Sequence, residues 1–186
     1  NLLDITRASN HVTVSWNRFL RHDKTSLVGG GDKAVADEGK LKVTFHHNLW
    51  WDTKERSPRV RFGQVHVYNN LHVATAEAKF GYALGVGLRS RLFSEANAFE
   101  TPASVGAERL VRRFQGEAFF DRGSLHNGQP VDLLAALRRA NPGVDIAGDV
   151  GWAPSLFLPL DSAAEVAARV RAGAGAGRLW LAPERS

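Results

Sequence analysis

Two stretches of the chain share one pattern, VTFHHN at residues 43–48 and VHVYNN at residues 65–70. Each opens on a valine, continues with residues typical of a β-strand, and ends on an asparagine five positions after the valine. The same spacing recurs in VTVSWN at residues 12–17 and LFSEAN at residues 92–97. A bulky apolar residue follows each asparagine within two positions: Phe19, Leu49, Leu71 and Phe99. Four unrelated Asn turns are the alternative, but the repeated flanking residues favour an internal repeat.

The repeat has a fixed short core and a variable length. Its asparagines are 31, 22 and 27 residues apart (48−17, 70−48 and 97−70). Such variation is typical of a solenoid whose loops differ on one face. We expect each asparagine to occupy left-handed backbone at a turn, with its amide bonded to the equivalent residue one rung away.

The bulk composition limits the class of protein. The chain has 186 residues, of which 44% are hydrophobic and 23% charged, enough for one domain with a sizeable core. A net charge of +5 favours an anionic partner such as nucleic acid, acidic lipid or acidic polysaccharide. The absence of cysteine excludes disulfides, thiolate metal sites and cysteine nucleophiles. The chain has no methionine and residues 1–6 already predict a strand, so we expect a mature product or a fragment.

The character of the sequence changes after residue 100. Residues 131–139 predict a short helix that ends at an Asn-Pro-Gly sequence. Ser162 and Glu165 form a capping-box pattern, which predicts a second helix up to the glycine-rich residues 173–177. The apolar face of this second helix suits packing on the solenoid, and we expect the tail from Trp180 to be loose.

The predicted organisation is a single domain over residues 1–186. Residues 1–100 would form the coils that carry the site. Residues 101–186 would supply the last coil or coils, loops and the packing helix.

The densest cluster of charge is RSPRVRFG at residues 56–63, between the two quoted stretches. Pro58 favours extended backbone, on which Arg59 and Arg61 share one face. A solenoid could bring these cations and Lys24 into one groove, where guanidinium groups can bind carboxylates or phosphates. Nucleic acid is a weaker candidate, because exposed aromatic residues are not interleaved with the basic ones.

Other familiar sites are not supported by the sequence. The triple glycine at residues 29–31 lacks the Lys-Ser/Thr and helix that a phosphate loop needs. His46 and His47 are adjacent on a predicted strand, so we expect one ring to point inward and one outward, unable to share a metal ion. We likewise expect His66, which alternates with Val65 and Val67, to be a structural residue of a strand and not a metal ligand. No Gly-x-Ser-x-Gly elbow is present, and no carboxylate pair stands out.

Seven motifs follow one another in a specific order: LDITRAS (3–9), VTVSWN (12–17), KTSLVG (24–29), VTFHHN (43–48), R-x-P-x-x-R (56–61), VHVYNN (65–70) and E-x-N-x-F (95–99). In these motifs the sequence resembles the pectate lyases of the right-handed parallel β-helix type, polysaccharide lyase family 1. The resemblance is strong over residues 1 to about 100, and the segment from Gly151 to the Ala-Gly run is similar to the end of actinobacterial members. It implies an all-β fold, a right-handed parallel β-helix of C-terminal coils with short flanking helices near the C-terminus.

The resemblance also implies β-elimination of polygalacturonate with Ca²⁺. Arg56 matches the Brønsted base that removes the C5 proton, and Arg61 and Lys24 match residues that hold substrate carboxylates. Asp4 matches one of the calcium-binding aspartates. The implied partner is an acidic polysaccharide, with no nucleic acid and no membrane, and the implied protein is secreted and a monomer when complete.

This chain departs from the family pattern in two respects. The family has a basic residue where Thr6 stands, and the neighbouring Arg7 would face the other way on a strand. The other calcium carboxylates of the family belong to earlier coils, so we expect a C-terminal portion with little activity alone. Two alternatives remain: a pectin lyase acting on methylated pectin without Ca²⁺, against which Asp4 argues, and a non-catalytic polysaccharide-binding β-helix.

Overall fold

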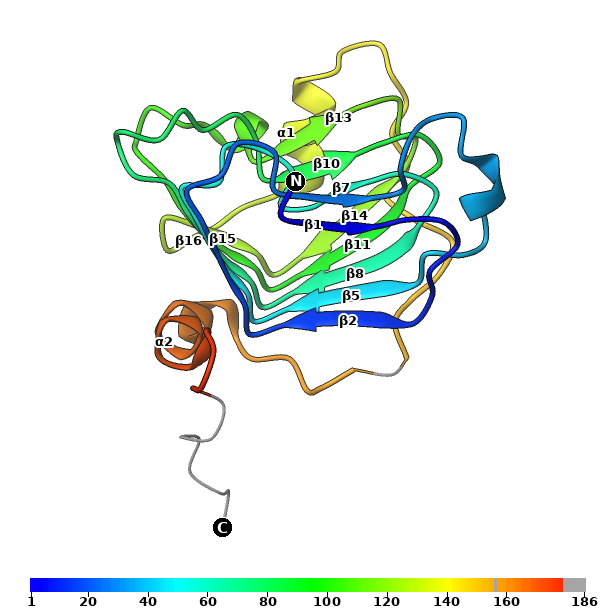
Figure 1. Cartoon of the computed structure of the whole chain (residues 1–186). Helices are drawn as coiled ribbons and strands as arrows, with labels where there is room; N and C mark the ends of the chain where they lie inside the picture. Colours follow the sequence, from blue (N-terminus) through cyan, green and yellow to red (C-terminus); the bar gives the residue numbers. More distant parts are fainter. Residues whose placement is uncertain (156, 179–186) are drawn as a thin grey trace.

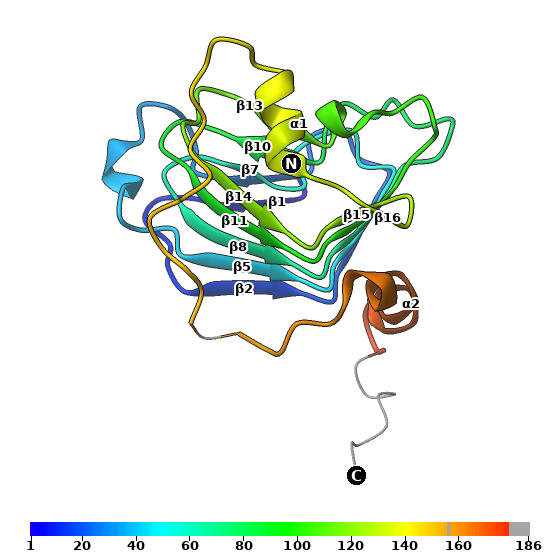
Figure 2. The ribbon, with the colours of Figure 1, turned by 180° about the vertical axis from the view of Figure 1, so that it is seen from behind.

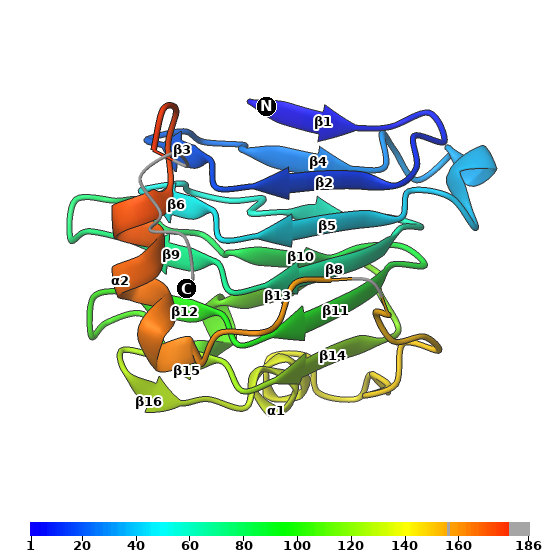
Figure 3. The same cartoon turned by 90° about the horizontal axis from the view of Figure 1, so that it is seen from below.

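The structure is a computed structural model that describes residues 1–155 and 157–178 (Figure 1). The chain winds through five coils, and each coil gives one strand to each of three parallel sheets. The coils stack from β1 at one end to α1 at the other (Figure 3). The predicted parallel β-helix is therefore confirmed, and the predicted loose tail from Trp180 lies outside the described residues.

The three sheets follow the same order of coils. Sheet 1 contains β1 (Leu3–Ile5), β4 (Ser26–Val28), β7 (Arg59–Val60), β10 (Leu84–Val86) and β13 (Val111–Arg113). Sheet 2 contains β2 (Val12–Ser15), β5 (Val43–His46), β8 (Gln64–Tyr68), β11 (Arg91–Glu95) and β14 (Phe119–Arg122). Sheet 3 contains β3 (Arg18–Leu20), β6 (Leu49–Trp51), β9 (Leu71–Val73), β12 (Ala98–Glu100), β15 (Leu125–His126) and β16 (Gln129–Pro130), which pairs antiparallel with β15.

The repeat predicted from the sequence sets the register of sheet 2. Val12 pairs with Val43, Val43 with Val65, and Val65 with Leu92. These side chains point into the solenoid, where Val65 and Leu92 are fully buried. One apolar residue per coil at the same register position therefore builds a continuous core along the axis.

The asparagine ladder is confirmed, but the backbone conformation at the turn differs from the prediction. The side-chain amide of Asn48 donates to Asn70 Oδ1 at 3.0 Å, and that of Asn70 donates to Asn97 Oδ1 at 3.1 Å. The left-handed residue is the one before each asparagine, as at His47 (φ 53°) and Asn69 (φ 50°). That residue turns the corner and leaves the asparagine buried, with its amide aimed along the ladder.

Two helices cover the solenoid. The first, α1 (Leu133–Arg139), begins two residues later than predicted, because Asp132 accepts a hydrogen bond from the backbone of Ala135 at 2.8 Å and caps it. Its buried Leu133 and Leu137 join the main core at the end of the stack. The second helix, α2 (Ala163–Gly173), lies along sheet 3 (Figure 3). None of the described helices is long and apolar enough to cross a bilayer.

The apolar face of α2 packs on the outer side of sheet 3. Val166 and Val170 are fully buried against residues of successive coils, Leu49, Leu71 and Ala98. The predicted capping box takes a different form, since Ser162 Oγ donates to the Glu165 carboxylate at 2.8 Å rather than bonding the helix backbone.

The prediction that His46 and His47 point to opposite faces is wrong. The strand β5 ends at His46, and the left-handed backbone of His47 turns its ring toward the same side. The two Nδ1 atoms lie 2.8 Å apart. Residues 140–155 run along the outside of the coils (Figure 2). Residues 157–162 cover the two histidines, with His47 Nε2 3.0 Å from Asp161 Oδ2.

Candidate active site

The predicted site residues gather on and beside the outer face of sheet 1. Along this sheet Ile5, Val28 and Val60 point into the core. The alternate positions form an outer row in which each residue pairs with the next: Asp4, Leu27, Arg59, Gly85 and Arg112. The alternation of a β-strand therefore places Arg59 outward and Val60 inward, as the sequence predicts.

Arg56 and Asp4 are 52 residues apart in sequence (56−4), and the side chain of Asn1 links them by hydrogen bonds. Arg56 Nη1 donates to Asn1 Oδ1 at 3.2 Å, and Asn1 Nδ2 donates to Asp4 Oδ2 at 2.9 Å. The Arg56 side chain is 18% exposed and its Nε lies 3.6 Å from Glu55 Oε1. The candidate base and the candidate metal ligand thus share one surface.

Arg61 is held in place by the loop that follows β4. Its Nε donates to Asp32 Oδ1 at 2.5 Å, and its Nη1 donates to the carbonyl of Gly29 at 3.3 Å. Gly29 has φ +86°, and a Cβ there would lie 2.7 Å from the Arg61 carbonyl, so this close approach requires glycine. The Arg61 side chain is 12% exposed, and these two hydrogen bonds orient its guanidinium without a ligand.

Lys24 lies one coil before Arg56. It forms an isolated parallel bridge with Glu55, the residue that precedes Arg56. Lys24 is exposed, and among the described residues its ammonium group makes no ion pair. Lys24 and Arg56 therefore lie just before β4 and β7 of neighbouring coils, and Arg61 follows directly after β7.

Arg59 contributes a further cation that sequence reasoning left without a role. Its guanidinium carbon lies 3.9 Å above the centre of the Phe114 ring. Burial lowers the pKa of Arg59 below its ordinary value, and the neighbouring charge of Arg61 lowers it further. Burial also raises the pKa of the nearby Tyr82 to about 12, with Glu55 acting in the same direction.

Sequence reasoning missed Tyr82, Phe114 and Arg112, which surround Arg59. Arg112 follows Arg59 by two coils, with Gly85 between them in register. The steps of 26 and 27 residues (85−59 and 112−85) resemble the 27-residue step of the last two asparagines. Extending that period to sheet 1 is the signal that would have placed Arg112 beside Arg59.

The described residues do not by themselves form a calcium site. Ca²⁺ takes about 6–8 oxygen ligands. Over residues 1–155 and 157–178, no three His, Cys, Asp or Glu side chains are placed to share an ion. Asp4 offers one carboxylate, and one of its oxygens already accepts a hydrogen bond from Asn1.

The fold and the site define a parallel β-helix protein with a cationic outer face suited to a polyanionic ligand. A family model described as pectate lyase matches residues 1–142. The chain belongs to the pectate lyase family.

Individual relatives agree with this assignment. The chain is 37% identical over 179 residues to a pectate lyase of Bacillus subtilis (strain 168), covering 95% of this chain and 41% of the relative. It is 45% identical over 141 residues to pectate lyase E of Dickeya chrysanthemi, covering 70% and 35%. A solved pectate lyase bound to a hexasaccharide superposes with a TM-score of 0.87 at 37% identity, covering 94% and 43%. The chain thus spans less than half the length of these relatives.

Proposed function

We propose that this chain carries the base and the carboxylate-holding cations of a lyase that cleaves polygalacturonate by β-elimination. The observation that carries the proposal is the hydrogen-bonded link from Arg56 through Asn1 to Asp4, a residue of the outer row of sheet 1. Family membership supports it, as does the solved relative that is bound to a hexasaccharide.

In the proposed reaction Arg56 removes the proton from C5 of a galacturonate residue. The electron pair moves toward the C6 carboxylate and then forms the C4–C5 double bond as the C4–O4 bond breaks. The departing sugar oxygen takes a proton from solvent, which balances the step. A guanidinium ordinarily keeps its proton up to a pKa above ~12, so its neutral form must be favoured by other cations. Arg59 and Arg61 are neighbouring cations on this part of the fold, and Glu55 Oε1 lies 3.6 Å from Arg56 Nε.

The substrate carboxylates would be held by Arg61 and Lys24. Arg61 already uses Nε on Asp32, which leaves guanidinium N–H groups in a fixed orientation for a ligand. Lys24 acts as a mobile point charge from the adjacent coil. Because the two cations come from different coils, they can contact different parts of one polymer chain.

We propose Asp4 as one ligand of a Ca²⁺ ion in the complete enzyme, where calcium would neutralise substrate carboxylate charge. The remaining ligands would come from outside this chain or from the substrate. The metal role has a readout that does not require turnover: Asp4→Asn in the full-length protein should weaken calcium binding measured by calorimetry. Unchanged calcium affinity would exclude Asp4 as a ligand. We also propose secretion, since the polymer substrate is outside the cell.

The activity is tested on the full-length protein and on residues 1–186 alone. Release of unsaturated oligogalacturonides from de-esterified polygalacturonate is followed by ultraviolet absorbance, with and without a chelator. We expect chelator-sensitive activity from the full-length protein and little from the isolated chain. Activity that prefers methylated pectin and resists the chelator would overturn the proposal in favour of a pectin lyase, and binding without turnover would indicate a polysaccharide-binding protein.

A further inference from the structure

In the outer row of sheet 1, Arg59 and Arg112 lie on either side of Gly85. Arg59 pairs with Gly85, and Gly85 pairs with Arg112. A Cβ at Gly85 would lie 2.8 Å from Arg59 Cγ and 2.9 Å from Arg59 Cβ. The missing side chain therefore leaves the aliphatic part of Arg59 room to lie across β10 toward β13.

Both guanidinium groups meet at one aromatic ring. The Cζ atoms of Arg59 and Arg112 lie 3.9 and 5.1 Å from the centre of the Phe114 ring. Arg112 is also 5.9 Å from the centre of the Tyr82 ring, which lies 5.2 Å from that of Phe114. Cation–π contacts of this kind fix the position of a guanidinium without neutralising its charge.

Neither arginine has an anionic partner within the part of the chain that the structure describes. Arg61 is paired with Asp32, which distinguishes it from Arg59 and Arg112. Glu108, which lines the same hollow as Arg112, is paired with Arg139 at 2.9 Å. The Nε of Arg59 is buried and has no hydrogen-bond partner among the described residues. A bound carboxylate would supply the counter-charge that these two guanidinium groups lack.

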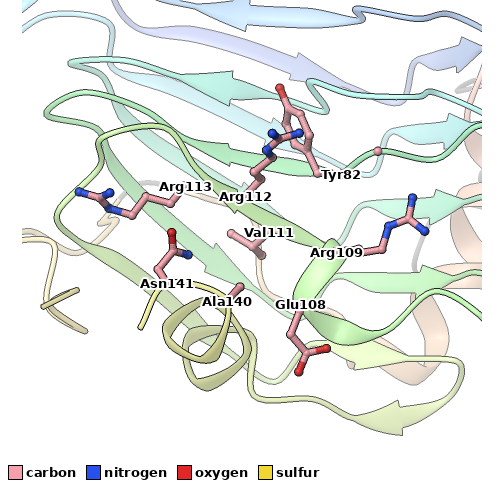
Figure 4. Close-up of a pocket in the computed structure, with 9 residues that line it drawn as sticks. Tyr82, Glu108, Arg109, Val111, Arg112, Arg113, Ala140 and Asn141 are labelled. Carbon is pink, nitrogen blue, oxygen red and sulfur yellow. The ribbon is translucent and has the colours of Figure 1, made fainter. Parts of the chain in front are cut away.

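A hollow of about 580 Å³ is lined by Arg112 and Tyr82 and lies between β13, the 3₁₀ turn η2 (Ala107–Arg109) and the end of α1. Figure 4 shows Arg112 and Tyr82 side by side at its wall. Arg113 Nε donates to the carbonyl of Gly116 at 2.7 Å, and Arg109 donates to the carbonyl of Phe80. Arg112 has no such hydrogen bond among the described residues, so its guanidinium is available to a ligand in the hollow.

We propose that Arg59, Phe114 and Arg112 form a second carboxylate-binding subsite, which takes a uronate of the same polymer at a distance from the residue undergoing elimination. This subsite rests on the proposed function, because it extends the same groove. Strands of a sheet are about 4.8 Å apart, so four steps separate Asp4 from Arg112 by roughly 19 Å. A polymer with one carboxylate per sugar can occupy both ends of this row, whereas a short oligomer cannot.

The test uses the full-length protein and a series of oligogalacturonides of increasing length. Arg112→Gln should raise KM for long oligomers and polygalacturonate by about 10-fold, the effect of losing one charge-assisted hydrogen bond, and leave kcat within about twofold. Short oligomers should show no change. The matched control is Arg89→Gln, which removes an exposed arginine paired with Glu38, away from the row.

Direct binding separates this subsite from the proposed reaction. In an Arg56→Lys background, calorimetry should show that Arg112→Gln lowers the affinity for long oligomers and leaves the affinity for trimers unchanged. Methyl-esterified long oligomers should bind with equal affinity with and without Arg112→Gln. If Arg112→Gln weakens the binding of long oligomers but the wild-type protein cleaves none of them, the subsite is supported and the proposed lyase activity is excluded. The subsite is overturned by an equal change at every length, by a loss of kcat alone, or by no change at all.

Discussion

Arg61 donates through its Nε to Asp32, a residue of the loop after β4, and this pair fixes the guanidinium beside the carbonyl of Gly29. The pair joins two consecutive coils at the edge of the candidate active site. It orients one cation in advance, so that less conformational entropy is lost when a carboxylate binds.

Removing Asp32 should therefore affect substrate binding more than chemistry. We expect Asp32→Ala in the full-length protein to raise KM about three- to tenfold, because Arg61 loses its orientation, with kcat within about twofold. Asp32→Glu should recover part of the effect. An equal fall in kcat with unchanged KM would contradict a positioning role.

Arg56 is predicted to act in the chemical step itself. Arg56→Lys keeps a positive charge but changes the position and geometry of the basic nitrogen, and it should lower kcat by about 10²–10⁴-fold, the usual contribution of a general base. KM should change little. The matched control is Arg89→Lys, which lies outside the site and should retain full activity. Retention of kcat in Arg56→Lys would show that another group is the base.

The asparagine ladder should be a large source of stability. Asn70 is fully buried and donates to the carbonyls of Phe45 and Tyr68 while it accepts from Asn48. Asn70→Ala would leave several buried groups unpaired and should lower the free energy of unfolding by about 2–4 kcal/mol. Asn17→Ala, at the exposed end of the ladder, should lower the free energy of unfolding by about 1 kcal/mol or less. Denaturant titration of both variants measures this difference, and equal costs would contradict it.

The covered histidines should make the fold sensitive to acid. The pKa of His46 is lowered to about 4, chiefly by burial and then by the charges of His47 and His66. Burial also lowers the pKa of His47 and His66, even though carboxylates oppose it at both. Below about pH 6.5 these three groups therefore bind fewer protons in the fold than in the unfolded chain. The unfolded state then binds more protons, so stability is full above about pH 6.5 and falls toward pH 4.

The pH effect is checked by denaturant titration from pH 7.5 to pH 4.5. His46→Phe keeps an aromatic ring to stack on Tyr68, 5.0 Å away, and removes one of the titrating groups. The substitution should reduce the slope of the free energy of unfolding against pH by up to about 1.4 kcal/mol per pH unit, which corresponds to one proton. His11→Gln, a change at an exposed histidine, is the matched control. Burial raises the pKa of Asp121 to about 6, which acts in the opposite direction and is common to all variants.

Much of the fold follows from local sequence. The valine-to-asparagine spacing predicts the register of sheet 2, because every coil must return an apolar side chain to the same core position. The cluster of Arg56 and Arg61 is predictable as well, since both residues lie within one short segment that contains β7. The physical basis is that a strand and its adjoining turn are determined by near neighbours in the chain.

Other features depended on contacts that no local pattern reveals. The rings of His46 and His47 meet because one left-handed residue turns the corner, which strand alternation alone does not predict. The family resemblance suggested Asp4 as a metal ligand, but only the stacking of coils shows that Asn1 joins it to Arg56.

By itself the sequence determined the coil repeat, the apolar core line and the family, because these depend on residue type at a regular spacing. The tertiary structure alone decided that Arg59 and Arg112, 53 residues apart (112−59), share the ring of Phe114. Their meeting depends on loop lengths that set the register of β7, β10 and β13, and on a glycine that leaves space between them.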